Sequence, residues 1–287
     1  MEIGTQKIEA GLYVVATPLG NLRDISLRAL DVLAAADFVY CEDTRVSGKL
    51  FAAYGLDTPR RSYHEHNAAA ARPKLLAQLE AGSAVALISD AGTPAISDPG
   101  LNLVQAVRAA GYRVHIVPGA SAVVAALSGA GFPTDKFYYV GFLPRQAAGR
   151  RKALMQAAVV PATLVIYESP HRLAALMGDI ATTLDKGESA RQICVAREMT
   201  KRFEEMIYGT AAELAAQFTT TPPKGEMVVL IAPPLKPAPA LLDDETILAA
   251  LETASLRDVV QTLMAQTGLP RKAIYQRTLD LSQKKKT

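Results

Sequence analysis

The chain has few of the features that mark secreted, metal-binding or membrane proteins. It contains only two cysteines, Cys41 and Cys194, which lie far apart in the 287 residues and form no C-x-x-C pair. This scarcity argues against a disulfide framework and gives no indication of a zinc site. No run of 18 apolar residues occurs, and the N-terminus shows no apolar signal core. We therefore expect a soluble, cytoplasmic protein without a membrane segment.

Three common active-site motifs are also missing. No G-x-G-x-x-G follows the first predicted strand, which disfavours a dinucleotide-binding site. No G-x-x-x-x-G-K-[ST] occurs, which argues against a P-loop NTPase. The serine of P-G-A-S-A (118–122) lacks the following glycine that a nucleophile elbow requires. H-E-H (64–66) would place two imidazoles on one face of a strand, but no third ligand is identifiable, so we predict no metal site.

The first 120 residues alternate between strand and helix patterns. Apolar segments that predict strands occupy residues 11–17, 37–41, 83–88 and 113–117. Helical patterns span 24–36, 74–82 and 100–111, and the second of them ends at a glycine. Wholly apolar strands separated by helices indicate a parallel α/β sheet.

The pattern changes near residues 129–136, G-A-G-F-P-T-D-K, which we take as a domain boundary. Strands are predicted at 137–142, 162–167, 193–197, 204–209 and 227–231, with helices from about Arg150 and His171, which indicates mixed α/β structure. A proline-rich linker (233–240) precedes three helical stretches. The predicted domains are an α/β domain at 1–130, a second α/β domain at 131–233 and a helical module at 241–287.

The C-terminal end of the helical module is basic. From residue 261 onward, six basic residues face one aspartate, a net charge of +5, which leaves −2 on the other 260 residues of a chain whose total is +3. The pattern is that of a helix-turn-helix: one helix, a turn with Gly268, and a second helix that starts at Pro270. Its core would include Val259, Leu263 and Ile274. Polyanion binding is one interpretation, and a solubilising tail is the other. The candidate polyanion-contacting residues, for which the family resemblance described below implies RNA as the partner, are Arg271, Lys272, Tyr275, Gln276 and Arg277.

Four predicted loops follow strands of the first domain. They are T-P-L-G (17–20), E-D-T-R (42–45), S-D-A-G-T-P (89–94) and P-G-A-S-A (118–122). Ligands bind beyond the carboxyl ends of parallel strands, where such loops gather. Asp90 directly follows a buried strand and is our candidate ligand contact, whereas Asp98 precedes P-G and is predicted to cap a helix.

Seven motifs occur in an order and spacing that identify a family. They are T-P-L-G-N-L-R-D-I-S, C-E-D-T-R, H-E-H-N, S-D-A-G-T-P-A-I-S-D-P-G, V-P-G-A-S-A, E-S-P-H-R and A-R-E-M-T-K. From about Gly11 to its end, the chain closely resembles the ribosomal RNA small subunit methyltransferase I family of the tetrapyrrole methylase superfamily. The resemblance implies an α/β fold with two domains of the class III S-adenosylmethionine methyltransferase type, followed by a helix-turn-helix-like module.

The resemblance also implies an activity and its partners. The family methylates the ribose 2′-hydroxyl of cytidine 1402 in 16S rRNA, with S-adenosyl-L-methionine as methyl donor. We therefore expect an rRNA (cytidine-2′-O-)-methyltransferase that acts on 16S rRNA within the 30S subunit, as a homodimer and without a metal. The cofactor site carried over from the family comprises Leu19, Gly20, Asp90, Gly92, Thr93, Ser121, Ala122, Tyr167, Ala196 and Gly225.

The sequence does not decide which residue accepts the proton of the hydroxyl group. Candidates for a general base are Glu168, Glu198, Lys201 and His66. Ion pairing is the structural alternative for the first three, across one helical turn for Glu168 and in a surface cluster for the other two. Two other functions compete with RNA methylation: a small-molecule methylase acting on a tetrapyrrole or precorrin, and a DNA-binding regulator that uses residues 243–287.

Overall fold

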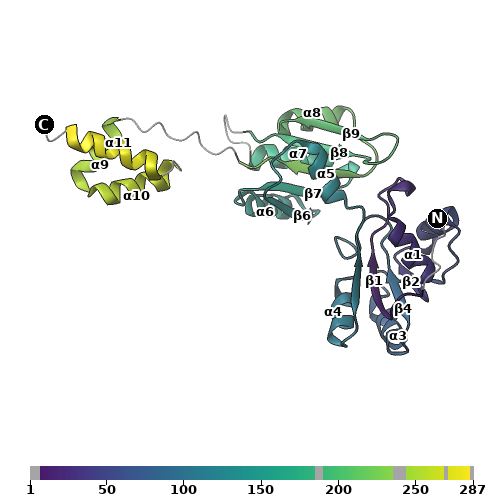
Figure 1. Ribbon diagram of the computed structural model, residues 1–287. Helices are drawn as coiled ribbons and strands as arrows, with labels where there is room; N and C mark the ends of the chain where they lie inside the picture. The colour runs from purple at the N-terminus through teal and green to yellow at the C-terminus, as the bar shows by residue number, and fades with distance from the viewer. Residues whose placement is uncertain (1–6, 185–189, 235–243, 268–270, 285–287) are drawn as a thin grey trace. The chain divides into compact units, whose positions relative to one another are not determined.

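The computed structural model describes residues 7–184, 190–234, 244–267 and 271–284, which belong to two compact units divided at Pro233 (Figure 1). The first unit holds two five-stranded sheets, and the second is helical. No helix in these ranges is both long and apolar enough to cross a membrane. The predicted α/β fold class, with helices at the C-terminal end, is confirmed.

The first sheet is parallel throughout, with the strand order β3-β2-β4-β1-β5. Its strands are β1 (Gly11–Val15), β2 (Phe38–Cys41), β3 (Arg60–Ser62), β4 (Ala84–Leu87) and β5 (Val114–Val117). Alternate strand residues enter two different cores, because successive side chains point to opposite faces. Val15 and Ala86 pack with the helices α1 (Leu27–Ala35) and α2 (Thr44–Tyr54). Val14 and Leu87 pack with α3 (Ala68–Glu80) and α4 (Leu101–Ala109) on the other face.

Side-chain caps explain two differences from the predicted helix boundaries. The helix predicted at 24–36 begins only at Leu27, because the Ser26 side chain accepts a hydrogen bond from the Ala29 backbone, and the preceding Leu22–Asp24 forms a separate 3-10 turn, η1. The E-D-T-R segment, predicted as a loop, starts α2, because the Asp43 side chain accepts a hydrogen bond from the Arg45 backbone. Short polar caps therefore decided where both helices begin.

The second sheet is mixed and has the order β6-β7-β10-β8-β9. Only β6 and β7 are parallel to each other, and the other pairs are antiparallel. The strands are β6 (Phe137–Phe142), β7 (Thr163–Glu168), β8 (Ile193–Arg197), β9 (Glu205–Gly209) and β10 (Met227–Ile231). The chain of β10 inserts between β7 and β8, so both of its faces are buried.

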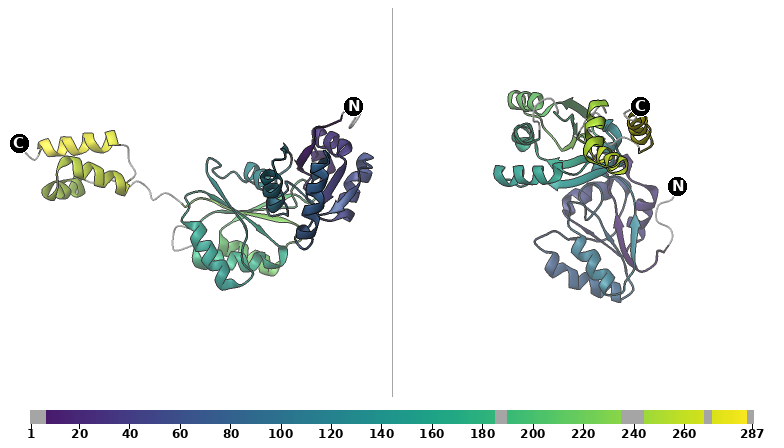
Figure 2. Two further views of the ribbon diagram at one scale, coloured as in Figure 1. Left: turned by 90° about the horizontal axis from the view of Figure 1, so that it is seen from below. Right: turned by 90° about the vertical axis from the view of Figure 1, so that its left-hand side faces the viewer.

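Helices cover both faces of this sheet. One face packs against α6 (Ala147–Ala158), α7 (Pro170–Thr183) and α8 (Ala211–Thr220), the teal and green helices that the left view of Figure 2 shows on one side. The other face packs against α5 (Ala122–Ala130), which follows β5 of the first sheet in the chain. The apolar residues of α5, including Val123 and Leu127, thus join the end of the first sheet to the core of the second.

The second unit contains α9 (Asp244–Thr253), α10 (Leu256–Thr267) and α11 (Arg271–Lys284). Val259, Leu263 and Ile274 are at most 3% exposed, which confirms them as core residues. The predicted turn at Gly268, the helix start at Pro270 and most of the predicted linker lie outside the described residues.

Candidate active site

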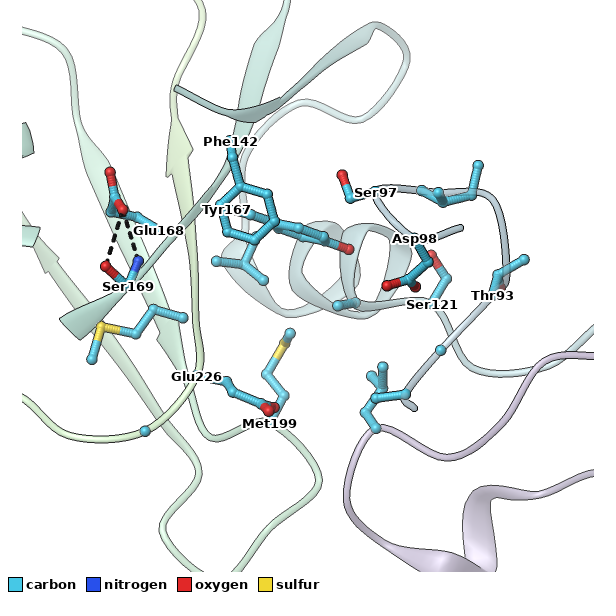
Figure 3. A pocket seen from close by; sticks show the side chains of 18 of the residues that line it. Thr93, Ser97, Asp98, Ser121, Phe142, Tyr167, Glu168, Ser169, Met199 and Glu226 are labelled. Carbon is cyan, nitrogen blue, oxygen red and sulfur yellow. Dashed lines mark hydrogen bonds between the residues drawn. The ribbon is translucent and has the colours of Figure 1, made fainter. Parts of the chain in front are cut away.

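A cavity of about 370 Å³ opens where loops of the first sheet meet loops of the second (Figure 3). Its volume falls within the range of about 300–1,000 Å³ that is usual for small-molecule sites. The wall from the first sheet's loops consists of Leu19, Ala91, Gly92, Thr93, Ile96, Ser97, Asp98, Ser121 and Ala122. The wall from the second sheet consists of Phe142, Tyr167, Glu168, Ser169, Pro170, Met199, Gly225, Glu226, Met227 and Val228.

The side chains around this cavity are apolar, hydroxyl-bearing or acidic. Tyr167 packs edge-on against Tyr139 and Phe142, with ring centroids 5.1 Å and 5.5 Å apart. Burial raises the pKa of Tyr167, so its hydroxyl stays protonated at neutral pH. None of the lining residues is lysine, arginine or histidine. This lining suits a compact ligand with apolar surface and positive charge, and it offers a phosphate no cationic partner.

Two loops that border the cavity have an unusual backbone conformation. Ala95 and Ser97, after β4, have φ values of 69° and 63°, and Glu198 and Thr200, after β8, have 49° and 65°. In the described ranges these four are the non-glycine residues with positive φ. Such conformations cost about 1–3 kcal/mol each and gather at binding sites. The strain therefore supports a ligand-binding role for both loops.

The two aspartates after β4 lie differently from our predictions. The prediction that Asp98 caps a helix is wrong, because Gly100 is the N-cap of α4 and no side chain bonds there. Asp98 instead lines the cavity (Figure 3), where burial and then the charges of Glu42 and Asp90 raise its pKa to about 6. Asp90 does not line this cavity; its Oδ1 accepts a hydrogen bond from the backbone N–H of Asp43, 3.0 Å away.

Asp90 belongs to a second, polar pocket of about 430 Å³. This second pocket lies at the carboxyl ends of β2, β3 and β4, and its lining residues are Glu42, Asp43, Thr44, Arg45, Ser62, His64 and Asp90. The two pockets therefore adjoin along the segment from Asp90 to Asp98.

Glu198 and Lys201 form an ion-pair cluster at the rim of the cavity. Lys201 Nζ lies 3.0 Å from Oε1 of Glu198 and 2.9 Å from Oε2 of Glu226. The backbone N–H of Glu226 also donates to Glu198, and this bond, with the one from Lys201, lowers the pKa of Glu198. Burial acts against the charge on Lys201, but its bonds to both carboxylates raise its pKa overall. The cluster matches the ion-pair alternative, and a protonated Lys201 cannot accept a proton.

The Glu168 carboxylate is buried and paired as well. Its Oε2 lies 3.2 Å from Arg172 in the first turn of α7, and its Oε1 accepts the backbone N–H of Ser169 at 2.8 Å (Figure 3). Arg172 also donates to the carbonyl oxygens of Leu143 and Pro144. The pair therefore ties the start of α7 to the loop after β6, as the salt-bridge alternative predicts, rather than serving as a free base.

His66 is exposed and lies on a turn. H-E-H does not lie on a strand, which the metal pair would have required: β3 ends at Ser62, and the side chain of Asn67 accepts the backbone N–H of His64, which starts the turn into α3. The two imidazole rings lie 6.1 Å apart, edge to face. Across the described residues, no group of three or more histidine, cysteine, aspartate or glutamate side chains could hold a metal.

Comparison with known proteins gives the family. The model of the tetrapyrrole (corrin/porphyrin) methylases matches residues 11–215. A Mesorhizobium japonicum protein named ribosomal RNA small subunit methyltransferase I is 46% identical over 282 residues, 98% of this chain and 95% of that protein. A protein of the same name from Escherichia coli O157:H7 is 46% identical over 222 residues, 77% of each. This chain belongs to the ribosomal RNA small subunit methyltransferase I family of tetrapyrrole methylases.

Solved structures agree on the fold. Uroporphyrin-III C-methyltransferase from Thermus thermophilus, complexed with S-adenyl homocysteine, matches with a TM-score of 0.56 at 18% identity, over 77% of this chain and 97% of that one. Diphthine synthase matches with a TM-score of 0.60 at 16% identity, over 77% of this chain and 89% of that one. As a tetrapyrrole methylase, the chain is a methyltransferase.

The structure brings together most of the residues that the methylase family pattern assigns to the cofactor. Those that line the cavity are Leu19, Gly92, Thr93, Ser121, Ala122, Tyr167 and Gly225. Gly20, Asp90 and Ala196 do not. Gly20 packs against Lys201, whose Cε would lie 2.5 Å from a Cβ at Gly20. Ala196 is fully buried and pairs with Val228 in the sheet.

Several lining residues of this methylase were not predicted. Phe142 ends β6, Met199 lies inside the A-R-E-M-T-K motif, and Glu226 follows Gly225. Each is next to a strand end or a family motif, and that position is the signal that could have indicated it. Asp98 lies within a recognised motif but was assigned to a helix cap.

The predicted RNA-contacting residues are all exposed on α11, but two have partners within the helical unit. Arg277 Nε lies 3.1 Å from Oδ1 of Asp244, and the Gln276 amide donates to Asp280. Arg271, Lys272 and Tyr275 are the better placed candidates, because no ion pair or hydrogen bond within the described chain engages their side chains.

Proposed function

We propose that this methyltransferase transfers a methyl group from S-adenosylmethionine to the ribose 2′-hydroxyl of cytidine 1402 in 16S rRNA, within the 30S subunit. The observation that carries the proposal is the cavity between the two sheets, which is acidic and aromatic and has no basic lining residue. That lining fits a sulfonium cofactor and not a phosphate-bearing one. Relatives at 46% identity, named for methylation of small-subunit rRNA, support the acceptor.

The cavity residues suggest how the cofactor is held. Gly92 and Gly225 have φ values of 78° and 94°, and their lack of a side chain lets the backbone approach a ligand closely. The hydroxyl of Thr93 donates to the Ala120 carbonyl at 3.0 Å, which fixes the loop after β4 to the loop after β5. We assign the aromatic wall of Tyr167 and Phe142 to the adenine and Asp98 to the positive charge.

Positioning supplies much of the rate in such a transfer. The cavity residues would hold the cofactor, which would supply an electrophilic methyl group to the hydroxyl oxygen and leave as the neutral thioether, while the hydroxyl proton would pass to a base. The rigid, strained loops on either side of the cavity hold the reacting groups in place. Glu168 is paired with Arg172, and Glu198 with Lys201, so either carboxylate would have to accept the proton while engaged in an ion pair.

Methyl transfer to 30S subunits that lack the modification tests the proposal. We expect label from S-adenosylmethionine to appear in 2′-O-methylcytidine, identified by mass spectrometry of the digested RNA. Transfer to neither 30S subunits nor free 16S RNA, by a protein that binds the cofactor, would favour the small-molecule methylase instead. We also propose a homodimer, which light scattering of the full chain would detect.

The pKa of Asp98 predicts a pH-dependent preference for the charged cofactor. With a pKa raised to about 6, Asp98 is ionised at pH 8 and largely neutral at pH 5. We expect the ratio of the affinity for S-adenosylmethionine to the affinity for S-adenosylhomocysteine, whose sulfur is uncharged, to fall roughly 10-fold from pH 8 to pH 5. A tenfold change corresponds to a shift of about one unit in the pKa of Asp98 when the charged cofactor binds. Calorimetric titration with both ligands measures the ratio.

Asp98→Asn is the matched variant. It should show a low, pH-independent ratio, and an unchanged pH dependence would contradict the role of Asp98.

The raised pKa also means that the folded chain binds this proton more tightly than the unfolded chain, so ionisation of Asp98 as the pH rises through about 6 destabilises the fold. The same Asp98→Asn substitution should therefore raise the melting temperature at pH 8 more than at pH 5.

Charge removal on α11 should weaken RNA binding. Arg271→Ala with Lys272→Ala removes two exposed charges, and each lost phosphate contact should lower the salt dependence of binding by about 0.7–0.9 in log–log slope. Filter binding to 16S RNA at several salt concentrations measures this slope. Arg257→Ala, on the exposed face of α10, is the control, and an equal effect of the control would argue against a specific role for α11.

A further inference from the structure

The second pocket, lined by Glu42–Arg45, Ser62, His64 and Asp90, has no role in the function described so far. It lies at the carboxyl ends of three neighbouring parallel strands, where α/β sheets bind ligands. At about 430 Å³ it can hold a ligand of nucleoside size. Its lining combines hydrogen-bond acceptors, hydroxyls and an imidazole, which suits a polar ligand rather than an apolar one.

The three carboxylates of the pocket differ in how they are engaged. Asp43 is paired with Arg45 at 2.6 Å, and Asp90 accepts the backbone N–H of Asp43. Glu42 makes no hydrogen bond or ion pair with any described residue, and burial, with the nearby charge of Asp90, raises its pKa. The carboxylate of Glu42 is only partly buried, so it is accessible to a ligand and can accept a hydrogen bond from it. Glu42 therefore marks where a donor group of the ligand would bind.

A positively charged strand edge adjoins the pocket. Arg60 and Arg61 lie on β3, the edge strand that ends at Ser62 of the pocket, and both are exposed. They project from opposite faces of this strand: the guanidinium carbon of Arg60 lies 4.7 Å from the ring centroid of Phe51, and that of Arg61 lies 4.3 Å from the ring centroid of Phe38. Neither forms an ion pair with a described residue, so their donors are available for phosphates.

The pocket is also next to the cofactor cavity. Asp90 lines the pocket, whereas Ala91, Gly92 and Thr93 directly after it line the cavity. The charges of Glu42 and Asp90 act on Asp98 across this segment. The pocket and the cavity therefore adjoin along this segment, and a nucleoside whose base lies in the pocket has to place its ribose 2′-hydroxyl past the segment, in the cavity beside the methyl donor.

We propose that the second pocket receives the target nucleoside of the RNA, with Glu42 accepting a hydrogen bond from the exocyclic amino group of cytosine and with Arg60 and Arg61 contacting phosphates of the strand that leads to it. This inference rests on the proposed RNA methylation. Carboxylates recognise cytosine through that amino group, and single-stranded bases are splayed out into such pockets. The three carboxylates of the lining disfavour a phosphate in the pocket, where Arg45 is already paired with Asp43, and the arginines beside the pocket attract phosphates.

Glu42→Gln tests the base contact. The variant keeps the shape of the side chain but replaces part of its acceptor capacity with a donor. We expect kcat/KM for 30S subunits to fall roughly 10-fold and the affinity for S-adenosylmethionine to stay within twofold. With 30S subunits carrying uridine at the target position, we expect the wild type to react at least 10-fold more slowly than with cytidine, and Glu42→Gln to lose most of this discrimination.

Arg60→Met with Arg61→Met tests the phosphate contacts and preserves the packing of the side-chain stems on the two phenylalanines. The log–log salt slope of RNA binding should fall by about 1.4–1.8, with cofactor affinity unchanged. Arg108→Met with Lys152→Met removes two exposed charges elsewhere and is the control. A slope change equal to that of the control would overturn the phosphate contacts.

The failures of the two proposals can be told apart. If the wild type methylates 30S subunits and both pocket variants match it in kcat/KM, cytidine discrimination and salt slope, the pocket is not the acceptor site, and the proposed function stands. If the wild type binds S-adenosylmethionine but methylates no RNA, the proposed function fails and this inference falls with it.

Discussion

Replacing Gly225 with alanine is expected to weaken cofactor binding roughly 100-fold while the chain still folds. Gly225 has a φ of 94°, and a Cβ there would lie 2.4 Å from the side-chain atoms of Glu198. The added methyl must displace either Glu198 or the backbone of Gly225, and both border the cavity. The cofactor requires the native conformation of this loop, and a cost of about 3 kcal/mol to restore that conformation on binding corresponds to roughly 100-fold in the dissociation constant.

Gly82→Ala is the matched control for this substitution. Gly82 has a similar φ of 80°, but a Cβ there would meet no atom within 4 Å. It therefore reproduces the backbone strain without the collision and lies outside the cavity. Isothermal titration with S-adenosylmethionine should give an unchanged dissociation constant for Gly82→Ala. Equal affinities of the Gly225 and Gly82 variants would show that the loop before β10 does not shape the cofactor site.

Arg172→Met is expected to cost about 3–5 kcal/mol of unfolding free energy, the cost of breaking a buried ion pair by removing one partner. The Glu168 side chain is fully buried, so the loss of Arg172 leaves a charge without a counter-ion. The loop after β6 also loses its bonds from Arg172 to the carbonyl oxygens of Leu143 and Pro144. Urea unfolding of the full chain measures the difference.

Two further variants separate the buried charge from general effects of losing an arginine. Arg113 pairs with Glu9, and both side chains are about 70% exposed, so Arg113→Met should cost no more than about 1 kcal/mol. Adding Glu168→Gln to Arg172→Met removes the unpaired charge and should recover part of the lost stability. A cost for Arg172→Met as small as that for Arg113→Met would mean that the Glu168–Arg172 pair does not hold α7 in place.

The strands could be predicted from the sequence because burial on both faces leaves a continuous apolar run. β4, β8 and β10 have only buried or nearly buried residues, and their predicted limits lie within one residue or two of those observed. The order β3-β2-β4-β1-β5 and the antiparallel insertion of β10 could not be predicted in the same way. An apolar run shows that a strand is buried, but it does not specify which distant strand pairs with it.

The same distinction between what the sequence predicts and what only the structure shows applies to the site. By itself, the sequence determined that small and hydroxyl-bearing residues such as Gly92 and Ser121 follow strands, and the shared carboxyl edge of a parallel sheet brings such positions together. Only the tertiary structure decided that Asp98 rather than Asp90 lines the cavity, and that Lys201 lies between Glu198 and Glu226. The direction of a carboxylate depends on the loop conformation, and the ionisation of a lysine depends on neighbours brought close by folding, neither of which local sequence encodes.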